Sequence, residues 1–482
     1  MVDASWEFIL DLCLLSAALL LATFLRTRIK WLQTFFVPNN IVAGFLLLAA
    51  GSEISGIVPI AGDRFGGYVY HLLALTFIAM ALRPAKSGGG RPMVVTGLIL
   101  TTGYALQAFL GCLICFAAIA WFQPDLFPTF GYFLVLGFGQ GPGQAYAMGK
   151  SWEPLGFEGA GSLGLTFAAV GYLWACLIGV GLVYWQTRGA RRLLAERLPE
   201  DERRGVIRDP ALQPEAGRQV TTPSAIDSMT FQLALVGLVY LATFALLKGF
   251  ESLLQSAIAL PAAADQAKST IWGLHFIFAT IMAISFRKAI LRLGWSHLLD
   301  NGSLTRISGA ALDFMVVASI AAISIGIFRQ YLALILITTT VGGLATVGLA
   351  LHTMHFFGLD HPIERMAAIF GTLTGTLSTG LTLSRIVDPQ FKTPASSDLV
   401  FGCGLAFPLS IPVLLSVMGP LMGRTQASPV TYFGAGLAFL GVYTLAVYMI
   451  LRWSARDMRV AGAPGEEKSI QAIGKSSFEK AL

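Results

Sequence analysis

The stretch Gly139-Gln140-Gly141-Pro142-Gly143-Gln144 decides the fold, because it lies inside an apolar segment, residues 128–150. In a helix interior Gly costs about 1 kcal/mol and Pro about 3 kcal/mol relative to Ala. A continuous helix through this stretch is therefore unfavourable, although its flanks are apolar enough to enter a membrane. We predict a helix that breaks within the apolar region and then resumes.

A second apolar segment, residues 364–386, is interrupted in the same way by Gly, Thr and Ser. The first segment ends in Lys150-Ser-Trp-Glu153-Pro154 and the second in Arg385-Ile-Val-Asp388-Pro389. Both endings read basic-x-x-acid-Pro, and they are separated by 235 residues. The same offset aligns the Gly/Gln run 139–144 with the Gly/Thr/Ser run 374–379. This recurrence predicts an internal repeat.

The composition is typical of a membrane protein. Of the 482 residues 55% are hydrophobic and only 12% are charged, whereas soluble domains are about 25% charged. This excludes a soluble enzyme, a nucleic-acid binder and a secreted disulfide scaffold. The net charge of +6 is explained by loop Lys and Arg. All five cysteines lie in apolar runs, and we interpret the Cys112/Cys115 pair as helix packing rather than a redox motif.

Eleven apolar segments are predicted to span the membrane, five in each half and one more at the end. They are residues 6–25, 32–51, 67–83, 93–121, 158–185, 229–249, 271–287, 308–328, 331–354, 398–421 and 430–451. Because five is odd, the second half enters the membrane from the opposite side. The predicted fold is an all-α polytopic membrane protein with two inverted five-span repeats, each carrying a broken re-entrant hairpin.

The chain then divides into a first repeat at 1–185, a cytoplasmic linker at 186–228, a second repeat at 229–421, an additional span at 430–451 and a cytoplasmic tail at 459–482. When the predicted spans alternate, most Lys and Arg fall on one side. The positive-inside rule makes that side the cytoplasm, with the N-terminus outside and the C-terminus inside. The first run, Trp6 to Leu25, is expected to be a retained span rather than a cleaved signal.

Paired broken helices in inverted repeats are typical of secondary transporters, which bind substrate and ions near the membrane midplane. Half-helix N-termini favour an anionic carboxylate, whereas carbonyl and hydroxyl oxygens suit Na⁺. An alternative is that the small residues merely allow close helix packing. The candidate substrate- and ion-binding residues are Gly139, Gln140, Gly141, Gly143, Gln144, Thr374, Gly375, Thr376, Ser378, Thr379 and Arg385.

Several charged or polar residues are further candidates. Asp313 and Asp11 each lie a few residues inside a predicted span, where an ionisable group is a functional candidate. Gln107 is a weaker one. Lys150 with Glu153, and Arg385 with Asp388, leave two alternatives open. Each pair either contacts substrate or forms a local salt bridge at the end of its hairpin. The His352, His355, Asp360 and His361 cluster matches no standard metal site, so we expect no resident metal.

These motifs resemble the bacterial sodium/glutamate symporter family over residues 6–421. Val37-Pro38-Asn39-Asn40-Ile41-Val42-Ala43-Gly44-Phe45-Leu46 is similar to the family's pattern at its second span, and Gly139 to Ala145 is similar to its first pore motif, typically G-H-G-T-G. Here Gln140 replaces His and Pro142 replaces Thr, and the second motif is richer in hydroxyls. The resemblance implies Na⁺-coupled glutamate uptake across a bacterial inner membrane, an elevator-like motion and a homodimer.

The predicted function is Na⁺-coupled symport of glutamate or a related small organic anion by alternating access. The expected partners are that anion, Na⁺ and the lipid bilayer, with no nucleic acid and no cofactor other than the coupling ion. One alternative is an H⁺-coupled or otherwise different organic-anion transporter. Another is a membrane-embedded glycan-processing enzyme, but the longest predicted outside loop, about 250–270, has only Glu251, Asp265 and Lys268 as charges. We therefore predict that the protein is not an enzyme.

Overall fold

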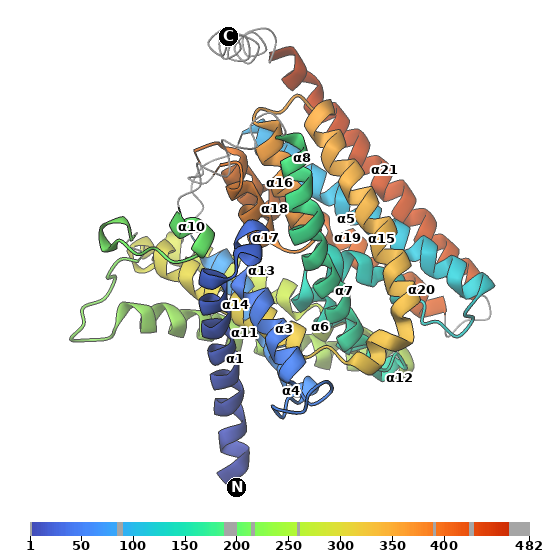
Figure 1. Ribbon diagram of the computed structural model, residues 1–482. Coiled ribbons are helices and arrows are strands. Elements are labelled where there is room, and N and C mark those ends of the chain that lie inside the picture. Colours follow the sequence, from blue (N-terminus) through green and yellow to red (C-terminus); the bar gives the residue numbers. More distant parts are fainter. Residues whose placement is uncertain are drawn as a thin grey trace, which may run out of the picture.

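The computed structural model describes residues 2–83, 90–187, 200–213, 217–257, 261–388, 392–423 and 429–461, and within them all regular secondary structure is helical (Figure 1). The predicted tail lies mostly outside the described residues, as do residues 188–199 and 214–216 of the predicted linker.

Nine described helices are long and apolar enough to cross a membrane, and a bent pair makes a tenth if it counts as one span. The nine are α1 (Val2–Arg28), α4 (Gly62–Leu82), α5 (Arg91–Trp121), α7 with η4 and α8 (Ala160–Trp174, Ala175–Gly179 and Val180–Gln186), α11 (Ser228–Ala257), α14 (Asn301–Ala321), α15 (Ile325–Phe356), α18 to α20 (Ala395–Leu409, Ile411–Leu415 and Met418–Gly423) and α21 (Pro429–Ala461). The bent pair is α12 (Pro261–Gly273) and α13 (His275–Arg292), with an angle of 59°. The all-helical, multi-pass prediction is confirmed.

One of the eleven predicted spans, 32–51, is wrong. The structure has a short α2 (Lys30–Thr34), a turn, and then α3 (Asn39–Ala50). With 12 residues, α3 is about 18 Å long, which is less than the roughly 30 Å of a bilayer's hydrocarbon core. Pro38 stands at the start of α3 and lacks the N–H that a continuous helix would need. Hydropathy missed the break because both sides are apolar.

The predicted boundary between spans 308–328 and 331–354 is also misplaced. α14 ends at Ala321 and α15 begins at Ile325, so Arg329 lies one turn inside α15 instead of in a loop. The intervening turn contains Ala322 and Ile323, whose apolar side chains look like a continuing span.

Shorter elements complete the described chain. They are η1 (Phe130–Tyr132), η2 (Leu134–Gly139), α6 (Pro142–Trp152), η3 (Glu153–Leu155), α10 (Glu200–Arg204), η5 (Pro210–Leu212), η6 (Ser296–Leu298), α16 (Pro362–Leu373) and α17 (Leu377–Arg385).

Helix boundaries recur at the 235-residue offset found in the sequence. Shifted by 235, α5 would cover 326–356, and α15 covers Ile325–Phe356. The same shift takes the first residue of α6 to that of α17, and the first residue of α7 to that of α18. The order of elements around the two breaks is therefore the same in both halves.

Helix packing follows the same correspondence. α5 packs against α18, and their counterparts α15 and α7 also pack together. The 235-residue shift also brings α3 close to α13 and α4 close to α14 in the sequence. α3 packs against α14, just as its counterpart α13 packs against α4. Two counterpart pairs, α4 with α14 and α5 with α15, contact each other directly. The halves are thus interleaved rather than set side by side.

The outer helices expose apolar side chains. In the most apolar 18-residue window of α21 only 17% of the residues are buried, and in that of α1 only 22%. Large side chains such as Leu20, Val442 and Leu445 are more than half exposed. Apolar surface of this extent is unfavourable in water and typical of helices that face lipid.

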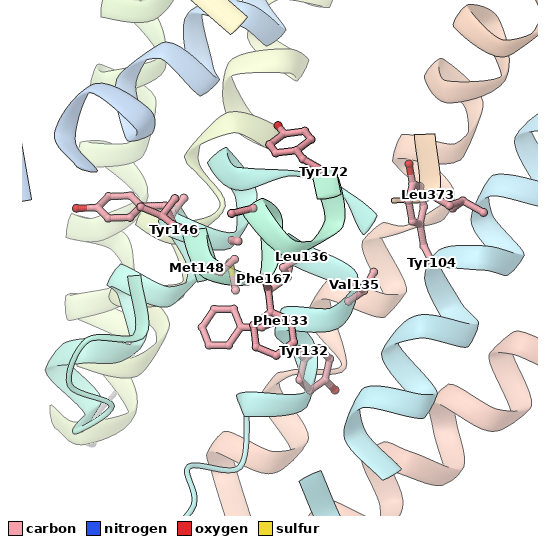
Figure 2. Packing of buried hydrophobic residues seen from close by; sticks show 14 of the residues in the cluster. Tyr104, Tyr132, Phe133, Val135, Leu136, Tyr146, Met148, Phe167, Tyr172 and Leu373 are labelled. Carbon is pink, nitrogen blue, oxygen red and sulfur yellow. The ribbon is translucent and has the colours of Figure 1, made fainter. Parts of the chain in front are cut away.

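An aromatic cluster fixes the first broken helix against α7. Phe133, next to η2, lies 5.9 Å from Phe167 of α7 and 5.2 Å from Trp152 of α6, measured between ring centroids. All three side chains are fully buried, and Figure 2 shows Phe133 and Phe167 packed together. This packing positions the break between η2 and α6.

Because α5 packs closely on the segment around Gly131, we predict that Gly111 does not tolerate a side chain. A Cβ on Gly111 would lie 2.1 Å from the Gly131 carbonyl oxygen, whereas a Cβ on Gly237 would meet nothing within 4 Å. We expect Gly111→Ala to destabilise the purified protein by about 1–3 kcal/mol and Gly237→Ala by less than about 0.5 kcal/mol. Thermal unfolding in detergent measures both, and equal midpoints for the two variants would contradict the packing.

Candidate functional site

The first break lies between η2 and α6. η2 is π-helical, and the Gln140 N–H donates to the Val135 carbonyl at 2.9 Å. Gly141 follows with φ +99°, a conformation that L side chains rarely adopt, and Pro142 starts α6. Gly143 packs tightly in the first turn, because a Cβ there would lie 2.5 Å from Leu73 Cδ1 of α4. The sequence-predicted break therefore falls at 140–141.

The second break lies between α16 and α17. Thr374 follows the last residue of α16, Gly375 comes next, and Thr376 is the extended residue that precedes α17. Thr374 and Thr379 are buried, Thr376 is half-buried and Ser378 is exposed. The hydroxyls of Thr376 and Thr379 lie 3.3 Å apart.

Other hydroxyls in this segment are turned back to their own helix. Thr372 and Thr374 donate to the carbonyls of Ala368 and Phe370, each at 2.8 Å. Thr382 donates to the Ser378 carbonyl at 2.9 Å. The Thr376 and Thr379 hydroxyls, by contrast, are directed toward each other beside the break.

The two breaks are in contact. A Cβ built on Gly141 would lie 2.9 Å from Thr376 Cγ2 and 3.3 Å from the Gly375 carbonyl oxygen. Residues separated by more than 230 positions in the chain are thus neighbours at the two breaks.

α7 contacts both broken helices. A Cβ on Gly171 would lie 2.8 Å from the Thr374 carbonyl oxygen and 2.9 Å from that of Phe138. The next residue, Tyr172, packs on Gly375, where a Cβ would lie 3.1 Å from the tyrosine ring. Figure 2 shows the Tyr172 hydroxyl pointing away from Phe133 and Phe167. Sequence reasoning missed both residues, because they lie in an ordinary apolar span.

Gln107 of α5 joins both breaks. Its Nε2 donates to the Leu373 carbonyl at 2.8 Å and to Thr346 Oγ1 at 3.0 Å. Its Oε1 lies only 2.0 Å from where a Cβ on Gly139 would be. A side chain at 139 would therefore displace Gln107 from the end of α16.

We call the place where Gly141 meets Gly375 and Thr376 the crossing. Several buried polar atoms belong to residues in or next to it. Among the described residues, Gln107 Oε1, Gln140 Oε1, Tyr172 Oη and Asn40 Oδ1 are buried without a hydrogen-bond partner. Most buried polar atoms in proteins are hydrogen-bonded, so these four oxygens are open to a ligand. Gln144, in the first turn of α6, is also buried.

Asp313 of α14 lies beside this group. Its Oδ1 accepts a hydrogen bond from Asn40 Nδ2 of α3 at 2.8 Å. It is also close enough to Tyr172 to interact with it electrostatically. The structure thereby links Asp313, a residue predicted from its place in a span, to Tyr172 of α7.

Charged residues at the hairpin ends make local contacts. Lys150 Nζ lies 2.7 Å from Glu153 Oε2 and 3.0 Å from Asp63 Oδ1. Glu153 Oε1 in turn accepts from the Gly161 N–H of α7 at 3.2 Å. These contacts close the base of the first hairpin and match the salt-bridge alternative for this pair.

Asp388 closes the second hairpin differently. Its carboxylate accepts from the N–H groups of Lys392 and Thr393 and from the Thr393 hydroxyl, at 2.7–2.9 Å. Partial burial acts to raise the pKa of Asp388, but these hydrogen bonds outweigh it and lower the pKa below its ordinary value. The Arg385 side chain is exposed.

A buried arginine that the sequence reading missed anchors the second hairpin. Arg365, in the first turn of α16, is only 2% exposed. Its Nη2 lies 2.6 Å from Asp360 Oδ1 and 2.8 Å from Asp398 Oδ2 in α18. Asp11, by contrast, pairs through both oxygens with Arg64, at 2.8 and 3.1 Å, and so joins α1 to α4 away from the crossing.

Comparison with known proteins identifies the family. The family model of sodium/glutamate symporters matches residues 5–263, more than half of the chain. The match includes the first break and α7, whereas the second break lies beyond it. No curated protein and no solved structure gives a match. The family is one of transporters and not of enzymes, and the chain belongs to it: this is a multi-pass membrane protein of the sodium/glutamate symporter family.

Proposed function

We propose that the protein takes up glutamate, or a related small organic anion, together with Na⁺ by alternating access, and that both bind where the two broken helices meet. The contact of Gly141 with Gly375 and Thr376 carries this proposal. The family supports Na⁺ and glutamate as the transported pair.

The crossing offers both N–H donors, which suit an anion, and oxygen atoms, which suit a cation. α6 and α17 begin there, and the first N–H groups of a helix have no partner within it. These N–H groups, with the positive end of each helix dipole, favour a carboxylate. Break carbonyls and the Thr376/Thr379 hydroxyls are oxygen donors of the kind that Na⁺ uses. We place the substrate carboxylates at the helix starts and Na⁺ at these oxygens.

Asp313 is proposed as the charged member of the ion site. Its exposed side chain is held by Asn40 and lies close enough to Tyr172 to interact with it electrostatically, and Asn40 Oδ1 and Tyr172 Oη are buried without hydrogen-bond partners. Asn40 and Asp313 come from α3 and α14, outside both hairpins. A cation bound there would draw the hairpins toward the α3/α14 pair, so ion binding and hairpin position would be linked.

We propose that the two halves, 1–185 and 229–421, are inverted repeats with re-entrant segments 128–150 and 364–386. The equal offsets of helix boundaries and the matching helix pairs support this. In Figure 1 α6 lies in the lower part of the molecule and α16 in the upper part, as hairpins entering from opposite sides would.

The remaining assignments follow from this topology and the family. We propose a bacterial cell membrane location with the N-terminus outside, a cytoplasmic linker at 186–228 and a cytoplasmic tail at 459–482. The start of α1 and the end of α21 lie at opposite ends of the molecule in Figure 1, in agreement with this orientation. We also propose a homodimer, with α21 as a span additional to the two repeats.

Bulky residues at the crossing should abolish transport. Leu at Gly141 would clash with Thr376 and require a strained φ, and Leu at Gly375 would clash with Tyr172 and Thr379. We expect Gly141→Leu and Gly375→Leu each to lower Na⁺-driven uptake of labelled glutamate into proteoliposomes at least about a hundredfold, since such clashes cost several kcal/mol.

The matched control is Gly404→Leu in α18, because a Cβ at Gly404 would meet nothing within 4 Å. It should transport like the unchanged protein, and all three variants should insert and elute normally. Normal uptake by both crossing variants would refute the site, and uptake driven by a pH gradient alone would favour H⁺ coupling.

Asp313 should set the Na⁺ requirement. Replacing it with Asn removes the charge but keeps the shape, and one charge-assisted contact is worth about 1.5–3 kcal/mol. We expect Asp313→Asn to raise the Na⁺ concentration for half-maximal glutamate uptake about tenfold or more. Asp11→Asn, which breaks the Arg64 pair, should lower thermal stability and leave the Na⁺ requirement unchanged. An unaltered Na⁺ requirement in Asp313→Asn would exclude Asp313 from the ion site.

A further inference from the structure

A basic cleft separate from the crossing lies where the end of α1 meets α2 and α10. α10 contacts both helices and lies beside the end of α1 that is remote from its start (Figure 1). The larger part of the cleft has a volume of about 460 Å³. Its basic lining residues are Arg28, Lys30, Arg203, Arg204 and Arg208.

Little negative charge in the described residues balances this cleft. Glu200 is the acidic lining residue and forms an ion pair with Arg204. Nearby, Asp201 accepts from the backbone N–H of Arg208 at 3.3 Å. No ion pair among the described residues involves Arg28, Lys30 or Arg203, and Arg203 Nε is buried without a hydrogen-bond partner. The cleft therefore suits an anion with several oxygen acceptors.

The rim of the cleft is apolar. Phe24 and Val206, which line it, are 56% and 38% exposed. Ile29, Trp31 and Ile207, each next to a lining residue in the chain, are 40–53% exposed. Exposed Trp beside Lys and Arg at the end of a span is typical of the membrane interface. A soluble anion would leave these side chains uncovered, whereas the acyl chains of a lipid would cover them.

We propose that this cleft binds the phosphate headgroup of an anionic phospholipid. Basic pockets beside spanning helices take up such headgroups through charge and hydrogen bonds. Arg26 already joins the two walls, since its Nε donates to the Arg203 carbonyl at 3.2 Å and its Nη1 to the Val37 carbonyl at 3.0 Å. A bound lipid would bridge Arg28 and Lys30 to Arg203, and so hold α10 against the end of α1.

Native mass spectrometry of the full-length protein in detergent tests this. With added phosphatidylglycerol or phosphatidylcholine, we expect the anionic lipid to bind at least about tenfold more tightly. Arg28→Gln/Lys30→Gln/Arg203→Gln should weaken phosphatidylglycerol binding about tenfold or more, since each basic residue contributes to headgroup attraction. Arg28→Lys/Lys30→Arg/Arg203→Lys should retain it, which separates charge loss from misfolding.

The control variant is Lys288→Gln/Arg292→Gln, which removes exposed basic residues at the end of α13, outside the cleft. It should bind phosphatidylglycerol like the unchanged protein. Equal binding by the triple Gln variant, or equal loss in the control, would overturn the site. Displacement of phosphatidylglycerol by millimolar inorganic phosphate would overturn the lipid assignment in favour of a free anion.

Discussion

Backbone that leaves a helix inside a membrane must be buried in protein or line a polar cavity, because lipid offers it no hydrogen bonds. In this protein the two interruptions meet that requirement together. Gly141 contacts Gly375 and Thr376, and Gly171 of α7 contacts the carbonyls of both broken helices. A Cβ on Gly171 would lie within 3.0 Å of both carbonyl oxygens, and Gly141 has φ +99°, a conformation that L side chains rarely adopt. The glycines are therefore needed for the two halves to meet.

The surrounding structure holds the two broken helices from both ends. At the crossing, Gln107 donates to the last carbonyl of α16 and abuts Gly139. At the far ends the anchors differ: Lys150 pairs with Glu153 and Asp63, whereas buried Arg365 pairs with Asp360 and Asp398. Removing one partner from a buried pair usually costs more than the pair contributes, so loss of Asp360 or Asp398, which would leave buried Arg365 short of a partner, should be more costly than loss of exposed Asp63.

Much of this fold could be predicted from the sequence. Hydropathy gave most spans, and Gly and Pro gave the first break almost to the residue. Hydropathy could not show that Pro38 divides 32–51, or that Ala322 and Ile323 form a turn, because all of these lie among apolar residues. Spacing aligned the two breaks but could not show that they touch. Gln107 is only a weak candidate and Tyr172 none at all until their partners are known, since a single polar residue in a span has many possible neighbours.

In the proposed mechanism Na⁺ and substrate share the oxygens and N–H groups of one crossing, so each should order the backbone that the other needs. Coupling of this kind is reciprocal in free energy. Titration calorimetry of glutamate binding to the purified protein, with Na⁺ and with an equal concentration of a large organic cation, tests this most directly. The account predicts that Na⁺ strengthens glutamate binding at least about tenfold and that glutamate strengthens Na⁺ binding by the same factor. Glutamate affinity that does not depend on Na⁺ would contradict it.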